Sequence, residues 1–282
     1  MPRVSLSSAG PIARLTLFSL LALLFSWSYW LAILAGQRGW LPIHLPLGPA
    51  GAFGPALAAL ATAALTGGRA EVGALLRSLL RWRVRWPFYL AALIGMTGVL
   101  GATVLIQAAR GVPLPAPANL DRWYLLPGVM LLILVLGGPL GEEIGWRGYA
   151  LPRLLERASP LVASLVLAAL WLVWHLPLFW LPGSSQAEVP LGTFAWTLLC
   201  YTPVFTWLHL RSGASTLLAV LLHTGINTAW FLLPAVLPGA MEQPGFSSSF
   251  LAVSTLVAAG VIAANARAFL GPAPRAARDA AR

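Results

Sequence analysis

Eight long apolar runs constrain the fold of this chain more than any other feature of its sequence. The runs cover residues 15–36, 49–67, 87–108, 124–150, 160–181, 191–210, 214–234 and 248–270. Most are close to the roughly 20 residues that a helix needs to cross the hydrocarbon core of a bilayer. Lipid offers backbone groups no hydrogen-bond partner, so such runs form helices rather than open strands. The sequence therefore predicts an all-α membrane protein, a bundle of about eight transmembrane helices.

Composition and organisation indicate a single polytopic membrane domain over residues 1–282. The chain is 59% hydrophobic and 9% charged, whereas soluble domains carry about 25% charged residues. No internal repeat or long linker divides it. The run at 15–36 is longer than the roughly 7–15 apolar residues of a signal peptide and lacks a clear A-x-A cleavage site, so we expect it to be retained. The segment 271–282 contains prolines and arginines and is predicted to be a disordered, solvated tail.

The net charge of +10 comes from arginine, and its distribution predicts how the helices are oriented. With a cytoplasmic N-terminus and eight alternating spans, fourteen arginines fall on the cytoplasmic side, three on the outer side and Arg147 within a span. This asymmetry is typical of the positive-inside rule and predicts that both termini are cytoplasmic. Topology and contact with anionic lipid explain these arginines, so we expect the bilayer and no nucleic acid as a partner. The arginine-rich, lysine-free composition also indicates a GC-rich bacterial genome, and hence a bacterial cell membrane.

Two of the acidic residues, Glu142 and Glu143, lie inside an apolar run. Charged groups at the bilayer centre cost a few kcal/mol each, so these carboxylates are functional candidates. On a helix, Glu143 and Arg147 are four residues apart and share a face, while Glu142 points about 100° away. The spacing therefore predicts an ion pair between Glu143 and Arg147 and leaves Glu142 for chemistry. The alternative is a buried ion pair that only fixes helix packing.

Two histidines also lie well inside apolar runs, namely His175 and His223, and Asn227 follows His223 by four residues on the same helix face. A lone intramembrane histidine is often only an interhelical contact. Two histidines together with Asn227 and a carboxylate pair favour a site. His209 stands at a cytoplasmic helix end, which explains it as an interfacial residue, and His44 lies in the first outer loop without a partner nearby in sequence.

A count of depth predicts that these groups meet in one layer. Glu142, His175 and His223 each lie 12–15 residues from a cytoplasmic connector, which is roughly 18–23 Å at about 1.5 Å per residue. Hydrolysis consumes water, so we expect a polar cavity among the spans 124–150, 160–181 and 214–234, opening to the cytoplasm. Further expectations are that Trp171, Trp174 and Phe179 wall this cavity or pack behind it, and that His209, Ser215 and Cys200 stay outside it.

The residue types narrow the possible intramembrane chemistry. The H-E-x-x-H motif of zinc proteases is absent, and the two aspartates that an aspartyl protease requires are not found in the spans. Ser215, a possible nucleophile, lies eight residues before His223, more than two helical turns away. What remains is a glutamate that can act as a general base for water, a histidine that can hold the same water, and a second histidine and an asparagine that can donate to an oxyanion.

These residues resemble the motifs of the CPBP family, the CAAX proteases and bacteriocin-processing enzymes that are also called Abi proteins. The motifs EExxxR, FxxxH and HxxxN correspond to Glu142-Glu143-x-x-x-Arg147, His175 and His223-x-x-x-Asn227, within a family core of about residues 125–235. One departure is visible, because Trp171 stands where the second motif has phenylalanine. The resemblance implies an eight-helix intramembrane endopeptidase in which Glu142 and His175 activate water. It also implies that His223 and Asn227 stabilise the oxyanion, and Glu143 and Arg147 play the supporting role inferred above.

The same resemblance leaves metal dependence open, because family members have been described both as metalloproteases and as metal-free glutamate proteases. If zinc is used, Glu142, His175 and His223 are the candidate ligands. Glu143 would then have to act as the base, although it is better placed to pair with Arg147. We therefore favour a site that requires no cofactor.

Two classes of function follow from these observations. The first is an endopeptidase that cuts a membrane-associated or lipid-anchored peptide near its C-terminus. The second is a non-enzymatic membrane protein, such as a transporter, a scaffold or a bacteriocin-immunity protein, that uses the same polar cluster. Transporters often contain two repeated halves, and this sequence has no such repeat. The sequence does not identify the substrate.

Overall fold

The computed structural model describes residues 10–271, and every regular element in that range is helical, as the apolar runs predict. The predicted tail at 271–282 lies, from residue 272 onward, outside the described residues. The helices are α1 (Pro11–Gln37), α2 (Gly54–Leu79), α3 (Trp86–Ala109), α4 (Leu126–Leu136), α5 (Pro139–Gly145), α6 (Leu151–Leu155), α7 (Pro160–His175), α8 (Leu191–Arg211), α9 (Thr216–Val236), α10 (Phe246–Ala264) and α11 (Ala266–Leu270).

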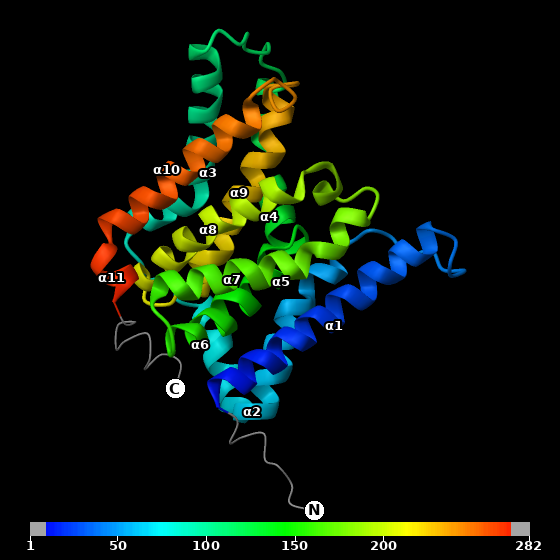
Figure 1. Cartoon of the computed structure of the whole chain (residues 1–282), viewed down its shortest axis with the longest axis vertical. Helices are drawn as coiled ribbons and strands as arrows, with labels where there is room; N and C mark the ends of the chain where they lie inside the picture. Colours follow the sequence, from blue (N-terminus) through cyan, green and yellow to red (C-terminus); the bar gives the residue numbers. More distant parts are fainter. Residues whose placement is uncertain (1–9, 272–282) are drawn as a thin grey trace, which may run out of the picture.

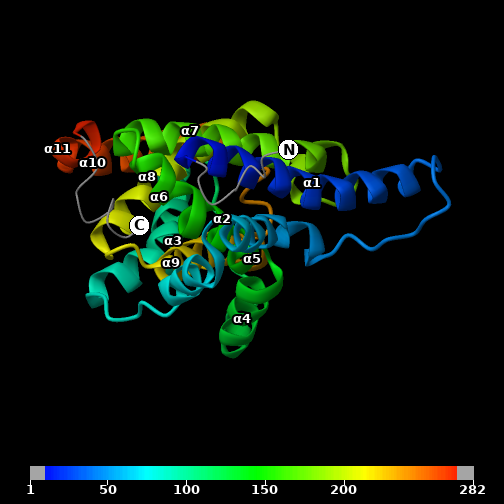
Figure 2. The same cartoon turned by 90° about the horizontal axis from the view of Figure 1, so that it is seen from below.

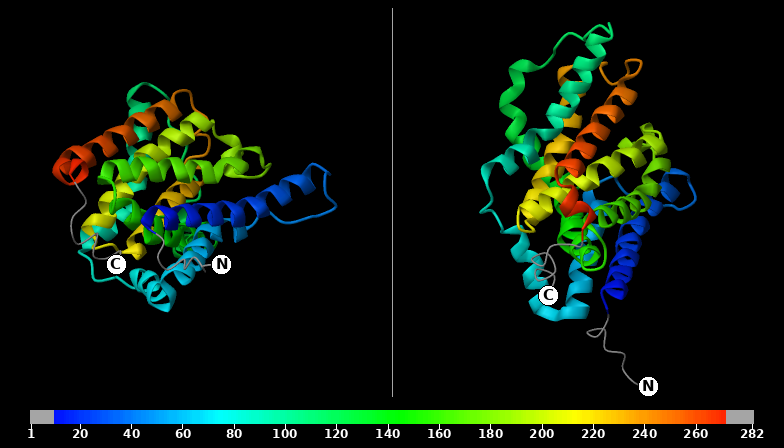
Figure 3. Two further views of the ribbon diagram at one scale, coloured as in Figure 1. Left: turned by 60° about the horizontal axis from the view of Figure 1, so that its bottom comes forward. Right: turned by 60° about the vertical axis from the view of Figure 1, so that its left-hand side comes forward.

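The long helices form two layers (Figures 1 and 2). Helices α1, α7, α8 and α10 make one layer, and α2, α5, α9 and α3 make the other, with α4 projecting from it. Within and between the layers, α1 packs along α2, α3 along α9, and α7 along α8, while the short α5 lies against both α2 and α9. The right view in Figure 3 shows the connector between α3 and α4 beside the turn between α9 and α10 at one end of the molecule, with α2 and the start of α1 at the other.

Most of the predicted spans are confirmed as membrane-crossing candidates. Six of the described helical segments are long and apolar enough to cross a bilayer, and the count rises to seven if one bent pair, Leu120–Leu136 with Pro139–Leu155, is a single span. The remaining expected span, 191–210, is the helix α8, which has the right length but is not among these candidates. Its four threonines, together with His209 and Arg211, make it more polar than the others.

Two breaks in the helices position the site. The helix α2 continues past the predicted span 49–67, but Gly68 has a φ of +63° and interrupts it, so that the second half of α2 changes direction. The bent pair turns by 44° at a second break, where Gly138 has a φ of +103°. Glycine adopts this region without the clash that a Cβ would cause. The chain then runs into α5 and a π-helical turn, Trp146–Ala150.

Small residues let α5 approach α2 closely. A Cβ at Gly145 would lie 2.6 Å from the carbonyl oxygen of Pro55, and one at Gly141 would lie 2.9 Å from the Cα of Phe53. No real Cβ tolerates such contacts. The two glycines therefore hold α5, and the carboxylates that lie between them, against the start of α2.

Candidate functional site

The centre of the candidate site is a buried ion pair on α5 and the π-helical turn after it. Arg147 Nη1 lies 2.8 and 3.0 Å from the two carboxylate oxygens of Glu143, and both side chains are fully buried. The predicted Glu143–Arg147 pair is therefore present in the structure. Arg147 also faces two aromatic rings, since its Cζ lies 3.8 Å from the ring centre of Phe205 and 4.4 Å from that of Trp171. Such rings attract a cation that has lost its hydration.

Glu143 has a second partner that sequence reasoning missed. His223 Nδ1 lies 2.8 Å from Glu143 Oε1, so one carboxylate holds both Arg147 and a histidine from α9. An ionised carboxylate only accepts hydrogen bonds, so the Nδ1 of His223 carries a proton. Its Nε2 then accepts a hydrogen bond when the ring is neutral and donates one when the ring is charged. The helix spacing predicts the contact of Glu143 with Arg147, but no pattern in the sequence predicts its contact with His223.

Glu142 points away from the ion pair, as the helical geometry predicts, but it too has a partner. The indole nitrogen of Trp171, in α7, donates a hydrogen bond of 2.7 Å to Glu142 Oε2. The sequence assigned Trp171 only to a wall of the cavity. Phenylalanine, the residue of the family motif, has no N–H, so this contact is a consequence of the one visible departure from that motif.

His175 is oriented by the main chain of its own helix. Its Nδ1 lies 2.8 Å from the carbonyl oxygen of Trp171. A carbonyl oxygen can only accept, so Nδ1 carries the proton and Nε2 keeps its lone pair. His175 is therefore set up to accept a hydrogen bond, from water for example, through Nε2.

The structure brings the four predicted catalytic residues to one cavity of about 430 Å³. Glu142, His175, His223 and Asn227 all line it, together with aromatic side chains from α8 and α9. The Nδ2 of Asn227 donates a hydrogen bond of 3.1 Å to the carbonyl oxygen of Gly137 and has a second N–H to offer. A neighbouring cavity of about 410 Å³ shares Glu142 and His175 with the first. The candidate site therefore lies where these two cavities meet.

The expected aromatic surroundings are also present. Trp171 lines the first cavity and Trp174 the second. Phe179 packs edge-on against Phe194, which lines the first cavity, so it lies behind the wall.

Three residues that were expected to stay outside the cluster do so. His209 lines a different cavity. The Ser215 hydroxyl caps α9 by accepting from the Leu218 N–H. Cys200 Sγ lies 3.8 Å from the hydroxyl oxygen of Thr255 in α10.

The two cavities share lining residues from one connector. Ser185 and Gln186, between α7 and α8, line both cavities. Among the described residues, none from the arginine-bearing connectors 80–85, 156–159 and 211–215 lines either cavity. His175 ends a helix of 16 residues, about 24 Å long, so the site lies far from the connector before that helix. The side of the membrane to which the cavities open stays a prediction.

Donor atoms that could hold a metal ion are engaged with other side chains in this structure. Within residues 10–271, no three His, Cys, Asp or Glu side chains come together in a way that could hold a metal ion. In the proposed zinc set, one oxygen of Glu142 accepts from Trp171, and Glu143, which would have to act as the base, is bonded to both Arg147 and His223.

Comparison with known proteins agrees with the family that the motifs indicate. Residues 124–229 match the family model of the type II CAAX prenyl endopeptidase Rce1-like proteins, a stretch close to the family core expected at about 125–235. Over 148 residues the chain is 31% identical to CAAX prenyl protease 2 of Methanococcus maripaludis. The alignment covers 50% of this chain and 52% of that relative, so the chain spans about half the length of the curated relative that it matches.

The placement of the cavities generates a prediction about accessibility. In a Cys200→Ala background, we expect Ser185→Cys and Arg83→Cys to react with a membrane-impermeant maleimide from opposite sides of the membrane, because α3, the bent pair taken as one span, and α7 lie between them. The positive-inside rule further predicts that position 83 reacts only from the cytoplasmic side. Labelling of sealed vesicles of both orientations measures this. Labelling of both positions from one side would contradict the fold, and labelling of position 83 from outside would show that the cavity faces the cytoplasm.

Proposed function

We propose that this chain is an intramembrane endopeptidase of the CAAX protease family, because residues 124–229 match the Rce1-like family model and half of the chain aligns with a CAAX prenyl protease. Its substrate would be a membrane-associated or lipid-anchored peptide. The observation that carries the proposal is the single cavity onto which Glu142, His175, His223 and Asn227 converge. A water-accessible carboxylate beside two histidines is the minimum that peptide hydrolysis requires.

The proposed first step is activation of a water molecule between Glu142 and His175. The Nε2 of His175 accepts a hydrogen bond from the water, since its Nδ1 is bonded to the Trp171 carbonyl oxygen. Glu142 takes a proton as the water oxygen attacks the scissile carbonyl carbon. The proton then passes to the leaving amine, so that Glu142 returns to its ionised form. The Trp171 indole holds the carboxylate in place during this cycle.

The proposed second element is stabilisation of the negative charge on the former carbonyl oxygen. A protonated His223 donates from Nε2, and Asn227 donates its second amide N–H. Glu143 supports the positive charge of His223 through its bond to Nδ1. With His223 protonated, the charges of Glu142, Glu143, Arg147 and His223 sum to zero. The cluster can then remain buried without a net charge, which a low-dielectric surrounding requires.

Substrate class is proposed from the surroundings of the site. The cavity lies among helices that cross the membrane, and its walls include Trp171, Phe194, Tyr201, Trp230 and Phe231. Apolar aromatic walls favour a peptide that carries an apolar anchor. The relative from Methanococcus maripaludis is a CAAX prenyl protease by name, so a prenylated C-terminal peptide is the first substrate to test, beside an unmodified apolar peptide.

Replacing Glu142 tests the general base. We expect Glu142→Gln to lower the cleavage rate of a reconstituted farnesylated C-terminal peptide by at least about 100-fold, because the amide cannot take a proton. Folding should be retained, since the amide has the same shape. Mass spectrometry of the products gives the rate, and thermal unfolding in detergent gives the stability. Glu188→Gln, in an exposed connector, is the matched control and should cleave at the wild-type rate.

The variant Arg147→Ala should lower stability, whereas Glu142→Gln should lower the cleavage rate. Arg147→Ala leaves Glu143 as a buried charge that has lost its arginine, which typically costs about 3–5 kcal/mol, so the main effect should be a lower melting temperature.

Full cleavage by Glu142→Gln would remove the assignment of the base. In that case a non-enzymatic role, as a transporter, a scaffold or an immunity protein, would become the better account.

The Trp171 contact generates a second prediction. We expect Trp171→Phe to lower kcat by about tenfold, because a hydrogen bond to a charged group contributes about 1.5–3 kcal/mol. KM and the melting temperature should stay close to wild type, because phenylalanine keeps a ring against Arg147. The control is Trp174→Phe, also in α7, which loses an indole hydrogen bond to Ser26 in α1. An unchanged kcat in Trp171→Phe, or an equal loss in Trp174→Phe, would show that the indole does not position Glu142.

Independence from metal is the third prediction. If Glu142 and His175 activate the water, cleavage should continue at the wild-type rate after treatment with a membrane-permeant chelator such as phenanthroline. Elemental analysis of the purified protein should accompany the assay. Stoichiometric zinc, with activity lost on its removal and restored on its return, would contradict the metal-free proposal and point to Glu142, His175 and His223 as ligands.

A further inference from the structure

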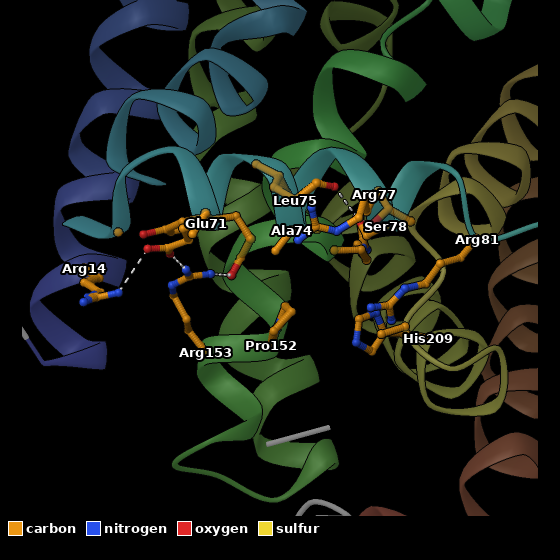
Figure 4. A pocket seen from close by; sticks show the side chains of 17 residues that line it. Arg14, Glu71, Ala74, Leu75, Arg77, Ser78, Arg81, Pro152, Arg153 and His209 are labelled. Atoms are coloured by element: carbon orange, nitrogen blue, oxygen red, sulfur yellow. Dashed lines mark hydrogen bonds and ion pairs between the residues drawn. The ribbon is translucent and has the colours of Figure 1, made fainter. Parts of the chain in front are cut away.

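A third cavity, of about 590 Å³, lies on the arginine-rich side of the bundle. Its walls come from the second half of α2, the π-helical turn, α6 and the connector between α8 and α9 (Figure 4). Five arginines and one glutamate line it: Arg14, Arg77, Arg81, Arg147, Arg153 and Glu71. None of its lining residues belongs to the proposed catalytic set Glu142, His175, His223 and Asn227. The cavity is therefore a strongly basic compartment that the proposed reaction does not use.

The one carboxylate in this cavity is shared. Glu71 forms ion pairs with both Arg14 and Arg153, as Figure 4 shows. Arg77 and Arg81 form no ion pair with a carboxylate among residues 10–271. Arg81 donates to the carbonyl oxygen of Gly213 at 2.6 Å, a bond that leaves its charge uncompensated. Two exposed guanidinium groups therefore face a cavity without a counter-charge.

Neutral hydrogen-bonding groups line the same cavity. The hydroxyl oxygens of Ser78 and Thr216 lie 2.7 Å apart, and both side chains are buried. The His209 side chain is 3% exposed, and its Nδ1 has no hydrogen-bond partner in the described part of the chain. Two hydroxyls and a buried histidine, placed beside unpaired guanidinium groups, form a built polar site rather than a patch of surface charge.

The segment that carries the basic side chains is also apolar on its exposed side. Leu76, Leu80 and Trp82 are 45%, 73% and 62% exposed. Exposed leucine and tryptophan at the end of a transmembrane bundle are typical of the membrane interface. A molecule that enters here meets positive charge inside and apolar side chains next to it, which is the pattern of a phospholipid with an anionic headgroup.

We propose that this cavity binds a phosphate group, with the headgroup of an anionic phospholipid as its source. Arg77 and Arg81 supply the positive charge, and guanidinium groups suit phosphate because they present paired N–H donors. The Ser78 hydroxyl donates to the carbonyl oxygen of Leu75 and accepts from Thr216, so these two side chains form a polar wall while the arginines make the phosphate contacts. Soluble inorganic phosphate shares this chemistry and is the other possible source.

The test uses the full-length protein in detergent, titrated separately with phosphatidylglycerol, phosphatidylcholine and inorganic phosphate at constant ionic strength. Thermal unfolding and native mass spectrometry measure binding. We expect saturable binding and stabilisation by phosphatidylglycerol and not by phosphatidylcholine. Arg77→Gln with Arg81→Gln should weaken that binding by about tenfold or more, since each arginine near an anionic headgroup contributes about 1 kcal/mol.

The matched control is Arg83→Gln with Arg85→Gln, which removes the same charge from the connector after α2 at positions outside the cavity. It should change the affinity by less than about twofold. Arg77→Gln alone serves if the double variant does not fold. Equal losses in both pairs, or equal effects of the two phospholipids with no effect of phosphate, would overturn the proposal. Saturable stabilisation by inorganic phosphate alone, lost in the Arg77 variant, would retain the phosphate site and overturn the lipid source.

Discussion

A carboxylate that is fully buried and shared by an arginine and a histidine is the constraint on which this structure depends. Glu143 accepts from Arg147 and from His223 at 2.8 Å each. Removing either partner would leave charge in a low-dielectric interior, where an unpaired ion is far more costly than a missing apolar contact. The interaction therefore fixes the depth of α5 relative to α9, and the aromatic faces of Trp171 and Phe205 hold the guanidinium from the other side.

The irregular backbone around the site follows from this constraint. Lipid does not tolerate unpaired backbone groups, so broken helices occur at membrane depth only where they are buried in protein or line a water-filled space. Here the break at Gly137 and Gly138 borders the cavities, and the Gly137 carbonyl oxygen is paired with Asn227. The π-helical turn carries Arg147, and such turns are frequent at functional sites. The glycines of α5 complete the arrangement by allowing contact with α2.

The sequence predicts the helices well, because each transmembrane helix requires a long apolar run that is visible in the sequence. The Glu143–Arg147 pair also follows from local spacing. The contacts of Glu143 with His223 and of Glu142 with Trp171 join residues 80 and 29 positions apart. Periodicity within one helix carries no information about which face of another helix it meets. The depth count predicts one layer for Glu142, His175 and His223, and the three side chains line one cavity.

Arg147 lies between the cavity that contains Glu142 and the arginine-rich cavity. On one side it holds Glu143, and through it His223 at the cavity that contains Glu142. On the other side it lines the basic cavity with Arg77 and Arg81. Neighbouring positive charges oppose burial of a further arginine, and Glu143 offsets that opposition only because it is ionised. The charged state of the proposed catalytic cluster and the charge of the arginine-rich face are therefore linked through one side chain. A phosphate group bound on that face would lower the repulsion on Arg147 and stabilise the same ion pair that positions His223.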